Sequence, residues 1–293
     1  MDRVRTGGDR GPWASEALDV VRAASGGMLF GIPLLYTVEV WWTGTSTRPP
    51  QMLGILALTF LPVLLLNRTA GFRSMRDVRL RDAVLDSVEA VAIGLVLVTG
   101  VLILLQEITR ATPLAVGLGK VVYEAMPFCI GIGVAHHFLQ RGRDEGDDTE
   151  DADAISRRGQ EQGLNATMAD VGATVIGSLF VALNIAATDE VPLLASSMSP
   201  QWLLALMAAS IAISYAIVFV AGFSGEDRRH SQVGVLQRPV TETMACYVIA
   251  LFSAALMLWF FQRAAGPWAV TLGEVVVLGL PAAVGGAAGR LAI

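Results

Sequence analysis

Apolar residues form eight long runs along the chain, and short polar segments separate these runs. The runs lie at residues 20–42, 51–67, 83–106, 113–138, 170–190, 201–222, 240–262 and 266–289. Most are about 20 residues long, the length that an α-helix needs to cross a hydrocarbon core of roughly 30 Å. The pattern predicts an all-α polytopic membrane protein with about eight transmembrane helices. The runs at 51–67 and 170–190 are the weakest, because the first is short and the second ends in acidic residues.

The second half of the chain resembles the first. Residues 111–135 can be laid on residues 265–289 at an offset of 154. Identical pairs in this alignment include Pro113/Pro267, Gly119/Gly273, Pro127/Pro281 and Gly131/Gly285. Earlier in the chain an offset of 150 places Glu39 on Asp189. These matches predict two four-helix repeats, which are parallel because an even number of helices returns the chain to the same side.

Composition supports a membrane protein and defines four regions. Hydrophobic residues make up 54% of the chain, and the net charge of −5 reflects mainly one acidic segment. We expect a cytoplasmic N-terminal segment (1–19), a first membrane repeat (20–139), an acidic cytoplasmic linker (140–168) and a second membrane repeat (169–293). The linker has few apolar residues to bury, so a solvated, largely disordered segment is expected. Its acids could instead bind a divalent ion, but they lack the spacing and turn glycine of a calcium loop.

Arginines indicate how the chain is oriented. They concentrate in one set of loops, and short loops rich in Lys and Arg stay cytoplasmic. Both termini are therefore predicted to be cytoplasmic, in a multi-pass protein of the inner membrane. The arginines from Arg68 to Arg81 suit contact with anionic lipid headgroups, although the same orientation rule explains them as well.

One carboxylate is expected near the middle of the membrane. Glu124 lies roughly 16 Å along its helix from Pro113, and ionisable residues at such depth usually face a bundle interior or a wet cavity. Lys120, the only lysine, stands one turn away, so an ion pair with Glu124 is expected. Pro127 frees the Tyr123 carbonyl beside this carboxylate, which would give a cation two ligands, although a plain packing kink explains the proline equally. The second repeat has Glu274 in place of Lys120, so a site here would be asymmetric.

Further polar residues mark the two ends of the predicted helices. Glu39 and the Asp189–Glu190 pair are expected at the outer ends, where they would ring a vestibule for cations or lie in headgroup water. Asn184 could bind an ion or hydrogen-bond between helices. Asp86, Glu89 and Glu242 are expected at the inner ends, where they would extend a cation path or pair with Arg79, Arg81 and Arg238.

The sequence has no motif typical of an enzyme, a metal site or a cofactor site. The HExxH, CxxC, nucleophile-elbow and phosphate-loop patterns are absent, and nothing indicates nucleic-acid binding. The run Glu39-Val40-Trp41-Trp42, together with Asn184 and Thr188-Asp189-Glu190, resembles a prokaryotic putative integral membrane protein family of unknown function. The resemblance implies a multi-span inner-membrane protein and gives no catalytic residues.

These observations lead to two functional hypotheses. The first is a cation or proton-coupled transporter or channel that uses intramembrane carboxylates. The alternative is a non-transporting scaffold or lipid-interacting protein whose acids are paired or interfacial. In either case the bilayer is the main partner, and four-helix repeats leave room for a homo-oligomer.

Overall fold

A computed structural model describes residues 12–69, 80–144, 159–221 and 239–291, and no strand occurs among these residues. The helices are α1 (Pro12–Leu35), α2 (Val38–Thr45), α3 (Pro49–Thr69), α4 (Leu80–Leu104), α5 (Leu114–Asp144), α6 (Gly159–Ala186), α7 (Glu190–Ser197), α8 (Pro200–Tyr215), the π-helix η1 (Ala216–Val220), α10 (Pro239–Phe260) and α11 (Trp268–Leu291). Seven of the described helical stretches are long and apolar enough to cross a membrane, or eight if the bent pair of α6 and α7 forms one span. The prediction of an all-helical protein with about eight spans is confirmed.

Two of the predicted spans are interrupted near one end. The run at 20–42 divides into α1 and α2, and the run at 170–190 ends its straight helix at Ala186, after which α7 turns away by 87°. Both breaks are stabilised in the same way, because a threonine hydroxyl satisfies a carbonyl that the ending helix leaves free. Thr37 donates to the Leu34 carbonyl (3.0 Å), and Thr188 donates to the Ile185 carbonyl (2.8 Å).

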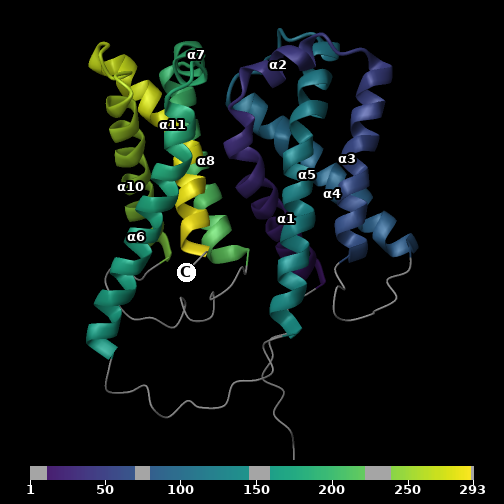
Figure 1. The fold of residues 1–293 in the computed structure, drawn as a ribbon, viewed down its shortest axis with the longest axis horizontal. Helices are drawn as coiled ribbons and strands as arrows, with labels where there is room; N and C mark the ends of the chain where they lie inside the picture. Colours follow the sequence, from purple (N-terminus) through teal and green to yellow (C-terminus); the bar gives the residue numbers. More distant parts are fainter. Residues whose placement is uncertain (1–11, 70–79, 145–158, 222–238, 292–293) are drawn as a thin grey trace, which may run out of the picture.

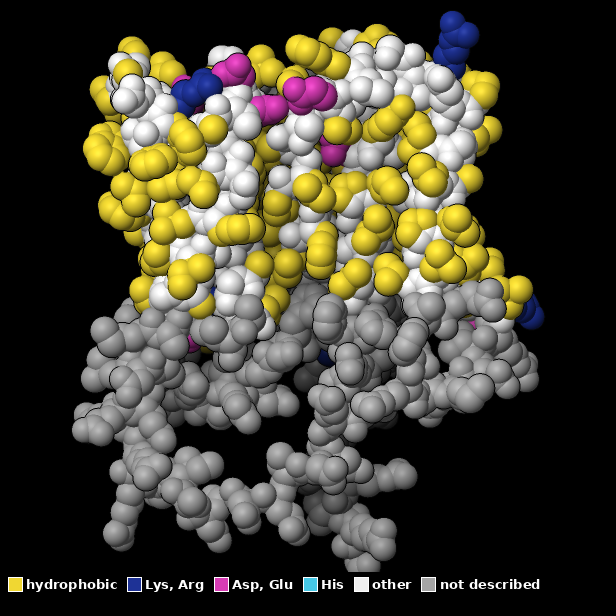
Figure 2. All heavy atoms as spheres, in the orientation of Figure 1, with side chains coloured by type: hydrophobic (Ala, Val, Ile, Leu, Met, Phe, Trp, Pro, Cys, Tyr) yellow, Lys and Arg dark blue, Asp and Glu magenta, His cyan; other side chains and the backbone are white. Residues whose placement is uncertain are grey.

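Helices α5 and α11 are the central elements of two groups that stand side by side (Figure 1). Helix α5 packs against α1, α2, α3 and α4, and helix α11 packs against α6, α7, α8 and α10. The spans of α5 and α11 are 61% and 72% buried, whereas no other single-helix span exceeds 33%. The remaining helices therefore cover these two and present apolar side chains outward, where a bilayer would contact them (Figure 2).

Glycines allow each central helix to approach its main partner closely. A Cβ atom on Gly131 of α5 would lie 2.5 Å from the Gly26 carbonyl oxygen of α1, and one on Gly285 of α11 would lie 2.5 Å from the Gly177 carbonyl oxygen of α6. Real Cβ atoms do not approach so closely, so both contacts require glycine. Backbone packing of this kind is typical of membrane helices. Their association is driven by close van der Waals packing, which small residues allow, and not by the hydrophobic effect.

The two-repeat arrangement stays a prediction, but several local features recur and support it. Helices α3 and α8 begin at Pro49 and Pro200, and Thr37 and Thr188 end α1 and α6, all at an offset of 151. This register pairs Glu39 with Glu190, whereas the sequence alignment paired it with Asp189. After α4 and α10, Gln106 and Gln262 both adopt a left-handed backbone, with φ of 63° and 57°.

The predicted linker at 140–168 is helical at both described ends. Helix α5 continues to Asp144 and α6 begins at Gly159, so these helices extend beyond the predicted membrane repeats. The acids between residues 145 and 153 lie outside the described residues, as do residues 70–79 of the arginine-rich segment.

Candidate functional site

Glu124 lies on α5, roughly 15 Å from the start of that helix, and its side chain is enclosed. It is only 2% exposed, and its Oε1 atom has no hydrogen-bond partner. The Trp41 indole N–H donates to the Leu35 carbonyl (3.0 Å) and lies within reach of the Glu124 carboxyl group. A carboxyl oxygen that is buried without a partner is costly, so it marks a candidate site for a proton or a cation.

Helices α2 and α7 lie at the same end of the bundle, the α2/α7 end (Figure 1). Helix α2 covers the Glu124 carboxyl group from this end. Trp41 of α2 is buried, and Gly44 of the same helix lies directly on the α5 backbone at Gly119 and Lys120. A Cβ atom on Gly44 would be 2.8 Å from the Lys120 nitrogen. The break after α1 therefore has a structural consequence, since it lets α2 lie across the end of α5.

Lys120 does not pair with Glu124, contrary to the expectation from their spacing. Its Nζ atom donates instead to Glu107 in the loop between α4 and α5, with 2.6 Å to Oε2 and 3.2 Å to the backbone oxygen. The loop places Glu107 beside the Lys120 side chain. Lys120 therefore pairs with Glu107 and not with Glu124, which is one turn away in the same helix. Glu124 is left without a cationic partner among the described residues.

The corresponding position in the other group of helices carries the opposite charges. Glu274 of α11 stands where α5 has Lys120, and Arg263 stands where the preceding loop has Glu107. Arg263 is close enough to Glu274 for their charges to interact, and it donates to Asp189 Oδ1 (2.7 Å) and to the Ala187 carbonyl (2.9 Å). Sequence reasoning missed Glu107 and Arg263, although each directly follows one of the equivalent glutamines.

The acids of the predicted outer ring occupy three different environments. Glu39 is exposed, and Asp189 is exposed and paired with Arg263. Glu190 is buried at the start of α7, and its Oε1 atom accepts the Val38 backbone N–H (3.1 Å) at the start of α2. Glu190 therefore connects the two groups of helices, and this geometry gives it a structural role.

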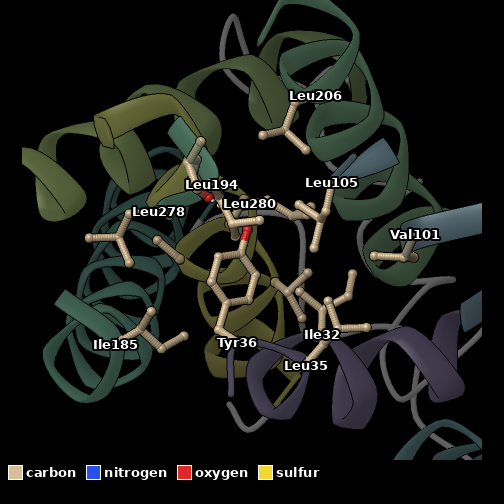
Figure 3. Packing of buried hydrophobic residues seen from close by; sticks show 14 of the residues in the cluster. Ile32, Leu35, Tyr36, Val101, Leu105, Ile185, Leu194, Leu206, Leu278 and Leu280 are labelled. Carbon is tan, nitrogen blue, oxygen red and sulfur yellow. Dashed lines mark hydrogen bonds between the residues drawn. The ribbon is translucent and has the colours of Figure 1, made fainter. Parts of the chain in front are cut away.

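The carbonyl that Pro281 frees in α11 accepts a hydrogen bond from the other group of helices. Pro281 leaves the Val277 carbonyl without its helical partner, and the Tyr36 hydroxyl donates to that oxygen (2.8 Å). The Tyr36 ring lies in the apolar core, between Ile32 and Leu35 of α1 and Leu278 and Leu280 of α11 (Figure 3). The Val277 carbonyl is thus occupied by Tyr36, which argues against its use as an ion ligand.

The acids predicted at the inner ends of the helices also lie in different environments. Glu242 of α10 pairs with the Arg290 guanidinium of α11, whereas Arg238, its expected partner, lies outside the described residues. Asp86 is half-buried and Glu89 is exposed, and neither forms a salt bridge with another described residue. Arg81 is exposed, and Arg79 lies outside the described residues.

Arg290 is the residue that sequence reasoning overlooked at this end. It is 1% exposed and lies near Asp170 as well as Glu242, with 3.9 Å between its Nε atom and the Asp170 carboxylate. An arginine in the last turn of a helix is usually an ordinary residue at the membrane boundary. Only the packing of α6 and α10 around it shows that it is buried.

The remaining candidate, Asn184, donates to the Phe180 carbonyl of its own helix (2.7 Å) and is exposed. Within the described part of the chain, no three His, Cys, Asp or Glu side chains come together in a way that could hold a metal ion. The enclosed Glu124 is therefore the strongest candidate for chemistry among the predicted residues.

Comparisons with known proteins identify a family but no characterised relative. Searches of curated proteins and of solved structures found no match. Residues 19–293 match the model of the family described as "Putative integral membrane protein (DUF2391)". The chain therefore belongs to this family of integral membrane proteins of unknown function.

Proposed function

We propose that this protein is a cation or proton-coupled transporter or channel, with Glu124 as the carboxyl group that binds the ion or proton. One observation carries the proposal: Glu124 is 2% exposed, its Oε1 atom has no partner, and the nearby Lys120 is held by Glu107. An ionisable group inside a span costs about 2.5–3.5 kcal/mol on insertion scales, so such residues are usually functional.

The enclosure of Glu124 favours a transporter over an open channel. Glu124 is only 2% exposed, and α2 lies against α5 beside it. A permanently open pore would leave such a carboxyl group in contact with water. Exchange at Glu124 therefore requires movement of α2, which lies over it, and transient opening of this kind is typical of transporters.

A flux assay with purified protein in liposomes tests the proposal. Imposed proton, monovalent-cation and divalent-cation gradients are followed with ion-sensitive dyes, and we expect flux of at least one ion above protein-free liposomes. Glu124→Gln should lower that flux at least tenfold, because the amide cannot exchange a proton and binds cations poorly. Glu16→Gln, at an exposed acid near the start of α1, is the matched control and should leave the flux unchanged. Absence of flux under every gradient would exclude the proposal.

The alternative function, a non-transporting scaffold or lipid-interacting protein, also has an observation in its favour. Three of the acids near the helix ends are engaged by cations, in the pairs Glu107–Lys120, Asp189–Arg263 and Glu242–Arg290. Paired acids of this kind stabilise a fold without transporting anything. Under this alternative, Glu124→Gln alters the thermal stability of the protein while no gradient produces flux.

The proposed setting is the inner membrane with both termini cytoplasmic, which the arginine distribution supports. In this orientation the α2/α7 end faces outward, and the segment from Arg68 to Arg81 meets the anionic headgroups of the cytoplasmic leaflet. Cysteine labelling of residues at the two ends in intact cells would test the orientation. Chemical cross-linking in native membranes would test whether the protein forms a homo-oligomer.

A further inference from the structure

A small enclosed cavity lies in the second group of helices, far along α11 from Glu274. It is walled by α8 with η1, by α10 and by α11. The polar residues that line it include Ser214, Tyr247 and Arg290. None of these residues belongs to the Glu124 site, so any ligand here would be independent of the function proposed above.

Ser214 differs from three other buried helical serines, and shares with Ser178 a hydroxyl that has no hydrogen-bond partner among the described residues. The hydroxyls of Ser25, Ser87 and Ser210 each donate to the carbonyl four residues earlier in their own helices, at 2.6–2.8 Å. This local bond is the ordinary solution for a serine inside a helix. Ser214 is 6% exposed, yet its hydroxyl has no hydrogen-bond partner and the residue lines the cavity.

The wall of the cavity offers further polar groups. The Tyr247 hydroxyl lies beside Ser210, whose own proton goes to the Leu206 carbonyl. The Tyr247 hydroxyl is buried and has no hydrogen-bond partner among the described residues, so it can donate to a ligand or accept from one. Arg290 adds guanidinium N–H donors, and its charge is balanced by Glu242 and Asp170. The cavity thus has both donors and acceptors.

The helix geometry beside the cavity is also irregular. Residues 216–220 form the π-helix η1, directly after Ser214 and Tyr215. A π-turn widens the helix and often accompanies a functional site. Phe219 of η1 stacks on Arg290, with 5.5 Å from the ring centre to the guanidinium carbon, so the irregular turn and the buried cation are in direct contact.

The size of the cavity selects the ligand. About 10 Å³ is open to the centre of a water molecule, and roughly 10–15 Å³ of such space holds one water with two to four polar partners. An organic molecule or a hydrated cation is too large. We propose that the cavity binds a single water molecule, which links the Ser214 hydroxyl, the Tyr247 hydroxyl and the Arg290 guanidinium.

This water connects the Arg290 end of α11 with the middle of the molecule. The Tyr247 hydroxyl lies against α11 at Gly279, two residues beyond the Val277 carbonyl that accepts the Tyr36 hydroxyl. The water therefore lies on the same stretch of α11 that contacts the other group of helices. Its loss would loosen the attachment of η1 and α10 to α11.

A density map fine enough to show ordered water tests the site directly. The expected result is a peak about 2.6–3.2 Å from both Ser214 Oγ and Tyr247 Oη. An empty cavity, with the Ser214 hydroxyl donating to the Ser210 carbonyl, would overturn the proposal.

A stability measurement tests the site independently. A water-filled cavity and a dry cavity predict changes in Tm of opposite sign for Ser214→Val. Ser214→Val fills the space with methyl groups. It should lower the Tm by about 2–4 °C more than Ser25→Val does, because the displaced water leaves the buried Tyr247 hydroxyl without a hydrogen-bond partner. Ser25→Val is the control, since Ser25 is a buried serine that bonds only within its own helix. If Ser214→Val raises the Tm, the cavity is dry and the proposal is wrong.

Discussion

The Lys120–Glu107 ion pair gives the sharpest test of how the Glu124 region is held. Its atoms are 2.6 Å apart, and the side chains are only 12% and 16% exposed. Removing one partner of a buried pair costs about 3–5 kcal/mol, because the other charge is left uncompensated. The residual exposure of both side chains places Lys120→Met at the lower end, near about 3 kcal/mol of unfolding free energy.

The partner variant should cost less, for a reason specific to this site. In Glu107→Gln, Lys120 still stands one helical turn from Glu124 and can turn to pair with it. We therefore expect a loss of about 1–2 kcal/mol for Glu107→Gln. The double variant removes both charges, so neither is left without its partner. Its loss of unfolding free energy should therefore be clearly smaller than the sum of the two single losses.

Thermal unfolding in detergent micelles, followed by circular dichroism, measures all three variants. At about 2–4 °C per kcal/mol, Lys120→Met should lower the Tm by roughly 6–12 °C and Glu107→Gln by roughly 2–8 °C. Additive losses in the double variant, or a Glu107→Gln loss as large as that of Lys120→Met, would contradict this account of the ion pair. The second outcome would mean that Lys120 cannot reach Glu124.

Four further substitutions test the packing and the helix ends by the same measurement. Gln106→Gly and Gln262→Gly should each raise the unfolding free energy by about 1 kcal/mol, because glycine adopts their positive φ without strain; a loss would mean that the amide side chains matter more than the backbone. Tyr36→Phe should lower it by about 1–3 kcal/mol, since the Val277 carbonyl loses its only side-chain donor among the described residues, and no change would show that the carbonyl is satisfied otherwise. Gly131→Val should destabilise the protein strongly by forcing α1 away from α5, whereas an unchanged Tm would contradict the close contact.

Hydropathy alone predicted the helical class and the number of spans, because membrane helices must be long and apolar whatever their neighbours. It could not show where a span breaks. Residues 20–42 are apolar on both sides of the break after Leu35, and the features that stabilise it are single bonds from Thr37 and Trp41. Equivalent threonines before an acidic residue, Thr37 and Thr188, were the available signal.

The candidate site was predictable only in part, for a different reason. The depth of Glu124 follows from counting along one helix, so its position inside a span could be inferred. The partners of charged residues depend on contacts between elements, and the sequence favoured the local Lys120–Glu124 pair over the distant Glu107. Arg290 was missed in the same way, because its burial comes from α6 and α10.

The junction between α1 and α2 ties the covered carboxyl group to the relative position of the two groups of helices. Two bonds from the other group hold this junction: Tyr36 donates to the Val277 carbonyl, and the Val38 N–H donates to Glu190. Each bond satisfies a backbone group, one freed by a proline kink and the other by the start of a helix. Leaving either group buried and unpaired costs about 1–3 kcal/mol. A movement that separates the two groups of helices must therefore break or carry along the junction, and with it the helix α2 that lies over Glu124.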